Sequence, residues 1–278
     1  MPGYEWVSFT TDYGEADGFT AVCRGVIARI APDARVIDVT HQVPPQDVRR
    51  GAGVLAQTLP WLPPAVHLAV VDPGVGTDRR GICLAAGGSV LIGPDNGLLV
   101  PAAEALGGAG AAYQLTDEAY WLAPVSATFH GRDVFAPVAA HLCTGVGPAA
   151  FGPEVPIESL VRLPAPAVTV GVGKVSAEVL SVDSFGNVQL AATAADLVAS
   201  GIGAGDRVFV HIGPAGRSAL VGRTFGDVGP GEVVVYPDAA GYVAVAVNGG
   251  NAAVTLDVRD ADSVLLVARP SLEASIVD

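Results

Sequence analysis

The apolar residues follow one pattern in the first half of the chain and another in the second half, and this change constrains the fold more than any other feature. In the first half, short continuous apolar runs alternate with segments in which apolar residues recur every three or four positions. The runs are typical of buried parallel strands, and the recurring pattern is typical of amphipathic helices. Strands that alternate with helices predict a layered α/β domain.

The expected elements of the first half can be placed along the chain. Strands are expected at residues 7–11, 36–39, 66–71, 82–85 and 89–92. Helices are expected at residues 19–30, 46–59, 97–106 and 132–142. Pro32 closes the first helix, because proline cannot continue one.

After Leu163 the chain consists of short β-rich runs separated by glycines. Strands are expected at residues 168–172, 174–182, 187–190, 207–212, 232–236, 241–247 and 253–258, with one short helix at 193–200. This pattern predicts a small β-barrel or sandwich. We therefore expect an N-terminal α/β domain over residues 1–160 and a smaller β-rich domain over 167–278, joined by a proline-rich linker.

Composition excludes some classes of function. The formal net charge of −13 disfavours binding to nucleic acid, because an acidic surface repels phosphates. The three cysteines are far apart and form no metal-binding pattern, which favours buried free thiols in a reducing compartment. No basic leader and no apolar stretch of roughly 20 residues is found, so we expect a cytoplasmic protein without a membrane span.

Polar clusters follow several expected strands, where open α/β sheets bind their ligands. They lie at residues 10–17, 72–80 and 128–133, and a further cluster lies at 183–187 in the β-rich half. Each cluster alone has an ordinary structural interpretation. Asp12 or Asp17 would cap the following helix, residues 72–74 would form a turn, and His130 would be a structural histidine.

Together with residues 93–99 and 248–253, these clusters resemble the S-adenosyl-L-methionine hydrolase (hydroxide adenosyltransferase) family, which is related to the 5′-fluoro- and 5′-chloroadenosine synthases. The resemblance covers nearly the whole chain. It implies cleavage of S-adenosyl-L-methionine by water at C5′, giving adenosine and methionine, with no cofactor and no metal. It also implies a homotrimer in which each active site lies between the N-terminal domain of one subunit and the C-terminal domain of the next.

The resemblance implies that Asp72, Arg79 and His130 position and activate the attacking water. Two roles stay open: His130 could act as the general base, or Arg79 could stabilise a developing hydroxide while Asp72 holds it in place. The adjacent Arg80 is an alternative to Arg79 in this set, but we interpret it as a solvated surface charge.

The same resemblance assigns the substrate contacts. Asp12 would bind the ribose hydroxyls, and Asp17 and Asp183 would bind the ammonium group. Phe185 would stack on adenine, and Asn187 would bind the edge of the base. Asp238-Ala239-Ala240 stands where relatives often carry small hydroxyl or basic side chains for the methionine carboxylate, so this carboxylate would rely on backbone N–H groups or on other residues.

Two alternatives are a halide-dependent 5′-halo-5′-deoxyadenosine synthase and a non-catalytic binding protein for adenosine or S-adenosylmethionine. The halogenating relatives carry an aromatic residue at the position of Asp72, a small hydroxyl residue at that of Gly131, and a long loop where this chain has only Gly87-Gly88. These differences favour water over halide. A binding protein would not require Asp72, Arg79 and His130.

Overall fold

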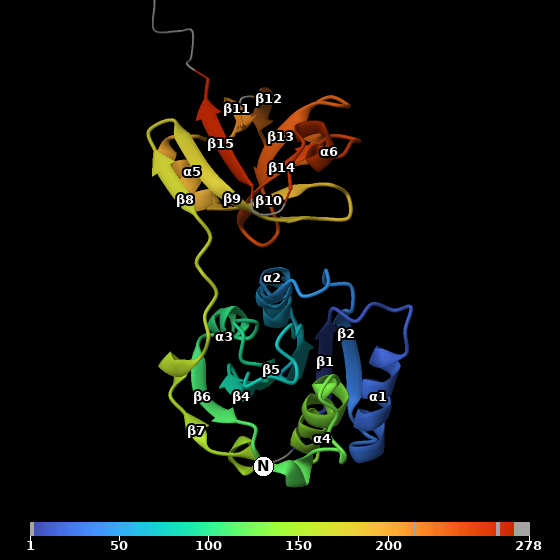
Figure 1. The fold of residues 1–278 in the computed structure, drawn as a ribbon. Coiled ribbons are helices and arrows are strands. Elements are labelled where there is room, and N and C mark those ends of the chain that lie inside the picture. The colour runs from blue at the N-terminus through green and yellow to red at the C-terminus, as the bar shows by residue number, and fades with distance from the viewer. Residues whose placement is uncertain (1–2, 214, 260–261, 270–278) are drawn as a thin grey trace, which may run out of the picture. The chain divides into compact units, whose positions relative to one another are not determined.

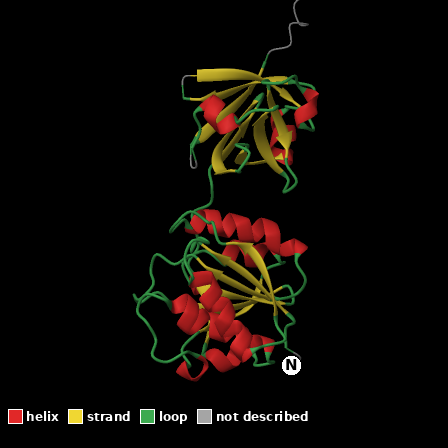
Figure 2. Cartoon of the chain, turned by 90° about the vertical axis from the view of Figure 1, so that its right-hand side faces the viewer, coloured by secondary structure: helices red, strands yellow, loops and turns green. Residues whose placement is uncertain are grey.

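The computed structural model describes residues 3–213, 215–259 and 262–269. The chain divides into two compact units, residues 1–163 and 164–278, and each has its own sheet and core. Helices cover the sheet of the first unit, whereas the second unit is mostly strand (Figure 2). The predicted fold class, an α/β domain followed by a smaller β-barrel domain, is confirmed.

The first unit is built on a seven-stranded sheet of order β2-β1-β3-β5-β4-β6-β7. Its strands are β1 (Trp6–Thr11), β2 (Arg35–Thr40), β3 (Val66–Val70), β4 (Gly81–Ala86), β5 (Ser89–Pro94), β6 (Ala109–Gln114) and β7 (Glu154–Val155). β1 is parallel to β2 and β3, and β3 is parallel to β5, whereas β4 is antiparallel to both of its neighbours. The carboxyl ends of β1, β3 and β5 therefore meet at one edge of the sheet.

Helices cover both faces of this sheet (Figure 1). They are α1 (Phe19–Ile30), α2 (Val48–Thr58), α3 (Val100–Ala105) and α4 (Ala136–Cys143). One core joins α1 and α4 to strand residues such as Phe9, and the other joins α2 and α3 to strand residues such as Leu91. Successive side chains of a strand point to opposite faces, so one continuous apolar strand supplies both cores.

Some helix boundaries differ from the sequence expectation. α2 begins at Val48, because Asp47 caps it by accepting a hydrogen bond from the Arg50 N–H, and Gln46 is left-handed with φ 67°. α3 begins at Val100 instead of residue 97, and the expected helix at 132–142 starts as a π-helical turn (Gly131–Phe135) before α4.

The N-terminus of α1 lacks a side-chain cap. Gly18 stands at the capping position, so neither Asp12 nor Asp17 caps this helix. The ordinary structural interpretation of these two aspartates is therefore wrong. Both side chains are left for other interactions of the loop.

The second unit is a barrel. Its strands are β8 (Val168–Gly171), β9 (Lys174–Val182), β10 (Val188–Thr193), β11 (Arg207–Ile212), β12 (Ala215–Val221), β13 (Val233–Pro237), β14 (Tyr242–Val247) and β15 (Ser263–Ala268). They form an eight-stranded sheet of order β10-β14-β13-β12-β11-β15-β9-β8. Because β9 also pairs with β10, the sheet closes on itself and leaves β8 as an added edge strand.

Two short helices accompany the barrel. α5 (Ala194–Ser200) starts from a capping box in which Thr193 and Asp196 bond reciprocally. The strand expected at 253–258 is wrong, since this segment forms α6 (Ala252–Leu256). The Asn251 side chain caps α6 by accepting a hydrogen bond from the Val254 N–H at 2.8 Å, which favours a helical turn.

Short 3-10 turns complete the chain at Leu59–Trp61, Glu118–Tyr120, Pro148–Phe151, Ile157–Ser159 and Phe225–Asp227. Among the described residues, no helix is long and apolar enough to cross a membrane.

Candidate active site

Three side chains from separated segments meet beyond the carboxyl end of β3. Arg79 donates to Asp72 through two hydrogen bonds, Nε to Oδ1 at 3.1 Å and Nη2 to Oδ2 at 2.6 Å. The same Nη2 lies 3.1 Å from Nδ1 of His130. The fold therefore brings together the acid, the guanidinium and the imidazole that the sequence motifs singled out.

Two members of this trio, Asp72 and Arg79, are largely withdrawn from solvent, whereas His130 is partly buried. The side chains of Arg79 and Asp72 are 9% and 5% exposed, and the guanidinium lies 5.3 Å from the centre of the Phe135 ring. Burial raises the pKa of the Asp72 carboxyl, and the adjacent Arg79 charge opposes that rise. Burial and the Arg79 charge both lower the pKa of His130, which favours the neutral imidazole at physiological pH.

A cavity of about 160 Å³ adjoins the trio and is lined in part by Arg79, His130 and Trp121. A cavity of this size has room for water molecules next to charged groups.

Close packing holds the loops that carry the trio. A Cβ added at Gly131 would lie 2.1 Å from the Tyr13 hydroxyl, so the phenol occupies the space of a side chain there. A Cβ at Gly76, where φ is 76°, would lie 2.2 Å from the Ala127 carbonyl oxygen. The loop after β1 and the loop after β3 thus both pack against the segment around His130.

The two predicted acids of the first loop lie apart from the trio's hydrogen bonds. Asp12 is half-buried, and its Oδ2 accepts a hydrogen bond from the Gln46 N–H at 2.8 Å. Asp17 is exposed on the same loop. Burial raises the pKa of the Tyr13 hydroxyl, and the charges of both Asp12 and Asp72 add to that rise.

The interpretation of Arg80 as a solvated charge is wrong. Its guanidinium donates to Asp95 Oδ2 through Nε at 2.9 Å and reaches the Ser159 carbonyl oxygen at 2.7 Å. The Asp95 side chain is 4% exposed, and its Oδ1 accepts a hydrogen bond from the Val161 N–H at 2.9 Å. Arg80 therefore braces the loop that carries Arg79.

The remaining predicted residues gather on the barrel. Asp183, Phe185 and Asn187 lie in the turn between β9 and β10 and line a pocket of about 750 Å³. Phe185 is 76% exposed, which leaves its ring face free to stack. A Cβ at Gly186 would meet the Asn251 side chain, so the motif at 248–253 packs directly against this turn.

Sequence reasoning missed several residues of this pocket, namely Arg223, Phe225, Tyr236, Pro237 and Val247. Phe225 and Tyr236 form a ring pair with centroids 5.2 Å apart. The available signal was Gly222-Arg223-Thr224-Phe225, an aromatic residue and a cation on a turn, but without a fold nothing connects that turn to residue 183.

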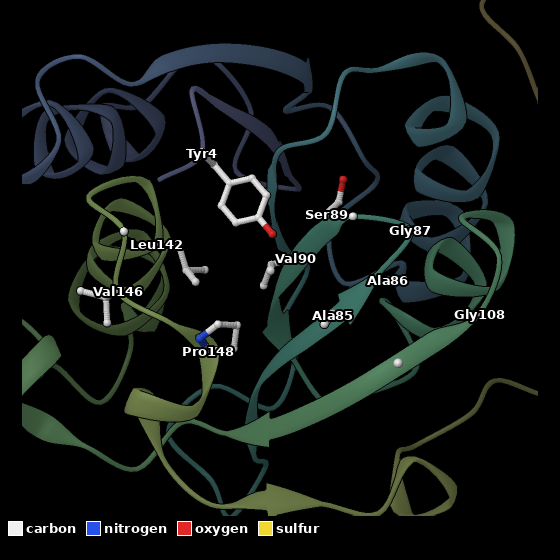
Figure 3. A pocket seen from close by; sticks show the side chains of 13 residues that line it. Tyr4, Ala85, Ala86, Gly87, Ser89, Val90, Gly108, Leu142, Val146 and Pro148 are labelled. Carbon is white, nitrogen blue, oxygen red and sulfur yellow. The ribbon is translucent and has the colours of Figure 1, made fainter. Parts of the chain in front are cut away.

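A further cavity, of about 390 Å³, lies at the opposite edge of the first unit's sheet. Tyr4 and Ser89 supply its polar side chains, among glycines and apolar residues (Figure 3). It holds no acid, base or cation, so it is not the candidate active site.

Neither the cysteines nor the candidate metal ligands of the described residues form a second functional site. Cys23 and Cys83 are buried free thiols, as predicted, and Cys143 is partly buried. Within the described ranges, no three His, Cys, Asp or Glu side chains gather in a way that could hold a metal ion.

Comparisons with known proteins identify the family of this chain. Residues 7–152 match the SAM hydroxide adenosyltransferase N-terminal domain, and residues 177–265 match the corresponding C-terminal domain. A curated (R)-S-adenosyl-L-methionine hydrolase of Salinispora arenicola is 59% identical over 268 residues, covering 96% of this chain and 100% of that protein. A fluorinase of Actinopolyspora mzabensis is 27% identical over 286 residues, covering 93% and 95%.

A solved structure has a similar fold. A conserved protein from Thermotoga maritima superposes with a TM-score of 0.89 at 37% identity, covering 94% of this chain and 99% of that one.

Proposed function

This chain belongs to the SAM hydroxide adenosyltransferase family, and on that premise we propose that it hydrolyses S-adenosyl-L-methionine to adenosine and L-methionine. The substrate is the (R) form named in its 59% identical relative. The single observation that carries the proposal is the Asp72–Arg79–His130 trio, gathered beyond the carboxyl end of β3.

The reaction depends more on the position of the attacking water than on an acid that protonates the leaving group. A sulfonium is a good leaving group, so methionine departs without protonation. The protein must hold a water molecule in line with C5′ and stabilise the hydroxide that forms when this water releases a proton to solvent. The hydroxide then forms the C5′–O bond as the C5′–S bond breaks, and methionine leaves with the electron pair of that bond. The Arg79 guanidinium can supply that stabilisation, and two hydrogen bonds to Asp72 fix its orientation.

The contact between Arg79 and His130 favours one of the two open roles. Arg79 can only donate hydrogen bonds, so Nδ1 of His130 is the acceptor in this contact. In the neutral ring the proton then lies on Nε2, which donates and cannot take a proton from water. We therefore assign to Arg79 the electrostatic stabilisation of the hydroxide. His130 orients the water or the residues that contact it.

The other predicted residues bind the nucleoside and the amino acid. Asp12 holds the ribose hydroxyls, and Asp17 and Asp183 attract the ammonium group. Phe185 stacks on adenine while Asn187 reads the edge of the base. The exposure of the Phe185 ring and the 750 Å³ pocket support this assignment.

The assembly in this proposal is a homotrimer in a reducing, cytoplasmic compartment. Each active site lies between the N-terminal unit of one subunit and the C-terminal unit of the next. The family resemblance supports the trimer, and the free cysteines support the compartment.

Water is the favoured nucleophile. Asp72 and Arg79 are charged groups that retain water, and Gly131 offers no hydroxyl to a halide. A protein that only binds adenosine or S-adenosylmethionine would not require the hydrogen-bonded Asp72–Arg79–His130 trio.

The test is product analysis by chromatography, with (R)- and (S)-S-adenosyl-L-methionine supplied separately, with and without chloride. We expect adenosine from the (R) form at a rate unaffected by chloride, and the label of ¹⁸O-water on the 5′-hydroxyl. Asp72→Asn should lower kcat by about 100-fold or more with little change in substrate affinity. A 5′-chloro product would support the halide synthase, and tight adenosine binding without turnover would support the binding protein.

A further inference from the structure

We propose that Arg223 recognises the carboxylate of the substrate's amino-acid moiety and thereby sets the preference of this chain for an amino-acid sulfonium. The inference rests on the proposed function, and it supplies the carboxylate partner that Ala239 and Ala240 cannot provide.

Arg223 lines the same barrel pocket as the predicted substrate contacts. This pocket of about 750 Å³ is bordered by Asp183, Phe185 and Asn187 on the β9–β10 turn, and by Arg223 and Asp238. Arg223 is the one cation among its lining residues. A ligand in this pocket therefore lies within reach of a guanidinium and of two carboxylates.

The two acids of the pocket already accept hydrogen bonds from neutral donors of their own unit. Asp183 accepts hydrogen bonds from the Phe185 N–H at 2.9 Å, the Asn187 N–H at 2.9 Å and Asn187 Nδ2 at 2.8 Å. Asp238 likewise accepts from two backbone N–H groups, at 2.9 and 3.0 Å, and from Gln189 Nε2 at 2.6 Å.

The guanidinium of Arg223 has no comparable partner. No carboxylate of the described residues forms an ion pair or hydrogen bond with it. The pocket therefore presents one guanidinium without an ion-pair partner beside two hydrogen-bonded carboxylates. A negatively charged ligand group placed there would meet five N–H donors in a planar fork, the geometry that suits a carboxylate.

The backbone that carries Arg223 is fixed in place. The N–H groups of Arg223 and Thr224 donate to Asp227 Oδ2 at 2.6 and 3.3 Å, and Thr224 and Asp227 form a capping box. A Cβ at the preceding Gly222 would lie 2.8 Å from the same carboxylate oxygen. The side chain thus extends from a rigid turn, which reduces the entropy lost when a ligand binds.

An α-amino acid matches this arrangement of charge. Its carboxylate pairs with Arg223, and its ammonium group takes the acceptor capacity that Asp183 retains beyond its three hydrogen bonds. A sulfonium nucleoside without the carboxylate would leave the guanidinium unpaired, and this difference is the source of the expected selectivity.

The test compares two substrates that differ only in this group: (R)-S-adenosyl-L-methionine and its decarboxylated analogue of the same sulfonium configuration. The kcat/KM for adenosine formation is measured with both substrates for the natural chain, Arg223→Gln and Arg223→Lys. Arg217→Gln is the matched control, because Arg217 lies on β12 of the same barrel outside the pocket lining. Calorimetric Kd values for both compounds are measured in parallel.

We expect the natural chain to prefer the carboxylated substrate by about 10- to 100-fold. Arg223→Gln should remove most of that preference, chiefly through KM, and Arg223→Lys should retain part of it because the charge remains without the planar fork. Arg217→Gln should keep the full preference, and the adenosine inhibition constant should be the same in all variants.

An equal loss with both substrates, or an undiminished preference in Arg223→Gln, would overturn the inference. If the natural chain bound the substrate but formed no adenosine, the proposed hydrolysis would be wrong, whatever the role of Arg223. The ratio of the Kd values for the carboxylated and decarboxylated compounds would then still test whether Arg223 binds the carboxylate.

Discussion

At the scale of single residues, Tyr13 shows how one side chain fixes two loops at once. Its ring packs against Phe19 and Phe129 with centroid distances of 5.9 and 5.8 Å, and its hydroxyl fills the space beside Gly131. Burial raises the pKa of this hydroxyl, so it stays protonated and can donate a hydrogen bond throughout the physiological range. The absence of a side chain at residue 131 is therefore a steric requirement of this site.

Replacing Gly131 by alanine tests that requirement. The added Cβ would lie 2.1 Å from the Tyr13 hydroxyl, and the packed ring cannot move aside without disturbing its neighbours. We expect a loss of about 1–3 kcal/mol in the free energy of unfolding and at least a tenfold loss of kcat/KM. Denaturant unfolding and adenosine formation measure the two effects.

Gly53→Ala is the matched control, because a Cβ there meets no atom within 4 Å and alanine favours the helix. If Gly131→Ala proved as stable and active as Gly53→Ala, the steric argument would be wrong.

The Arg79 charge should be visible in the titration of His130. Burial is the main cause of the lowered pKa of His130, and the guanidinium 3.1 Å from Nδ1 adds to it by disfavouring the imidazolium. Arg79→Met removes that repulsion and leaves the Asp72 charge, which raises the pKa of His130, so we expect this pKa to rise.

NMR titration of the histidine rings measures this rise. His141 is the internal control, since burial alone lowers its pKa. Equal shifts at both histidines would point to a general loosening of the fold.

The sequence indicated Asp72, Arg79 and His130 because each lies in a recognisable motif, and folding brings them into contact. Tyr13 and Arg80 belong to the same motifs, but their roles depend on partners distant in sequence. Nothing in the sequence pairs Tyr13 with residue 131, or Arg80 with Asp95. Contacts of this kind arise only when the loops are arranged in space.

At the scale of elements, β3 serves both the core and the site. Its end leads to Asp72, and His67 within it pairs through Nδ1 with the Ser8 hydroxyl of β1 at 2.7 Å. The Nε2 atom of His67 is buried and has no partner among the described residues. Burial lowers the pKa of His67 to about 4 from its ordinary 6.5.

This buried histidine predicts acid sensitivity of the first unit. In the unfolded chain His67 binds a proton near pH 6.5, whereas in the folded protein it stays neutral to about pH 4. Its contribution to stability is therefore complete above pH 6.5 and is lost as the pH falls to about 4, by about 3 kcal/mol.

His67→Gln, which cannot titrate, should unfold with a correspondingly weaker pH dependence over that interval. Tryptophan fluorescence in denaturant reports this unit selectively, since the three tryptophans, Trp6, Trp61 and Trp121, all lie in it. An unchanged pH dependence in His67→Gln would assign the sensitivity to other groups.

The sequence predicted most strands of the first unit well, because continuous apolar runs are a strong signal for buried strands. It failed where a local cap overrides the apolar pattern, as at Asn251, which turns the expected strand into α6. It also missed β12, where Gly216 and Arg217 weaken the strand signal and pairing with β11 and β13 compensates.

At the scale of the whole molecule, the predicted site is divided. The Asp72–Arg79–His130 trio belongs to the first unit, whereas Asp183, Phe185, Asn187 and Arg223 belong to the second. The change in hydrophobic pattern near residue 163 was enough to predict two kinds of architecture. A sequence pattern carries no comparable signal for assembly, because oligomer contacts depend on surfaces formed after folding.

Mixed trimers test whether the two halves of one active site come from different subunits. Asp72→Ala inactivates the first unit of a subunit, and Asn187→Ala impairs the second. In a trimer with shared sites, an Asn187→Ala subunit can supply an intact first unit to the intact second unit of an Asp72→Ala subunit. In every trimer that contains both variants, one of the three sites then combines two intact halves, so these mixed trimers should show about a third of the natural activity.

The two variants are produced together with different affinity tags, purified through both tags, and assayed for adenosine beside each variant alone. A site built within one subunit would always contain one damaged half, so the mixture would be no more active than the mean of its components. The matched control for assembly is an equal mixture of natural subunits and subunits that carry both changes. Recovery in the first mixture above the mean of its separate variants therefore requires that substrate contacts cross from one subunit to the next.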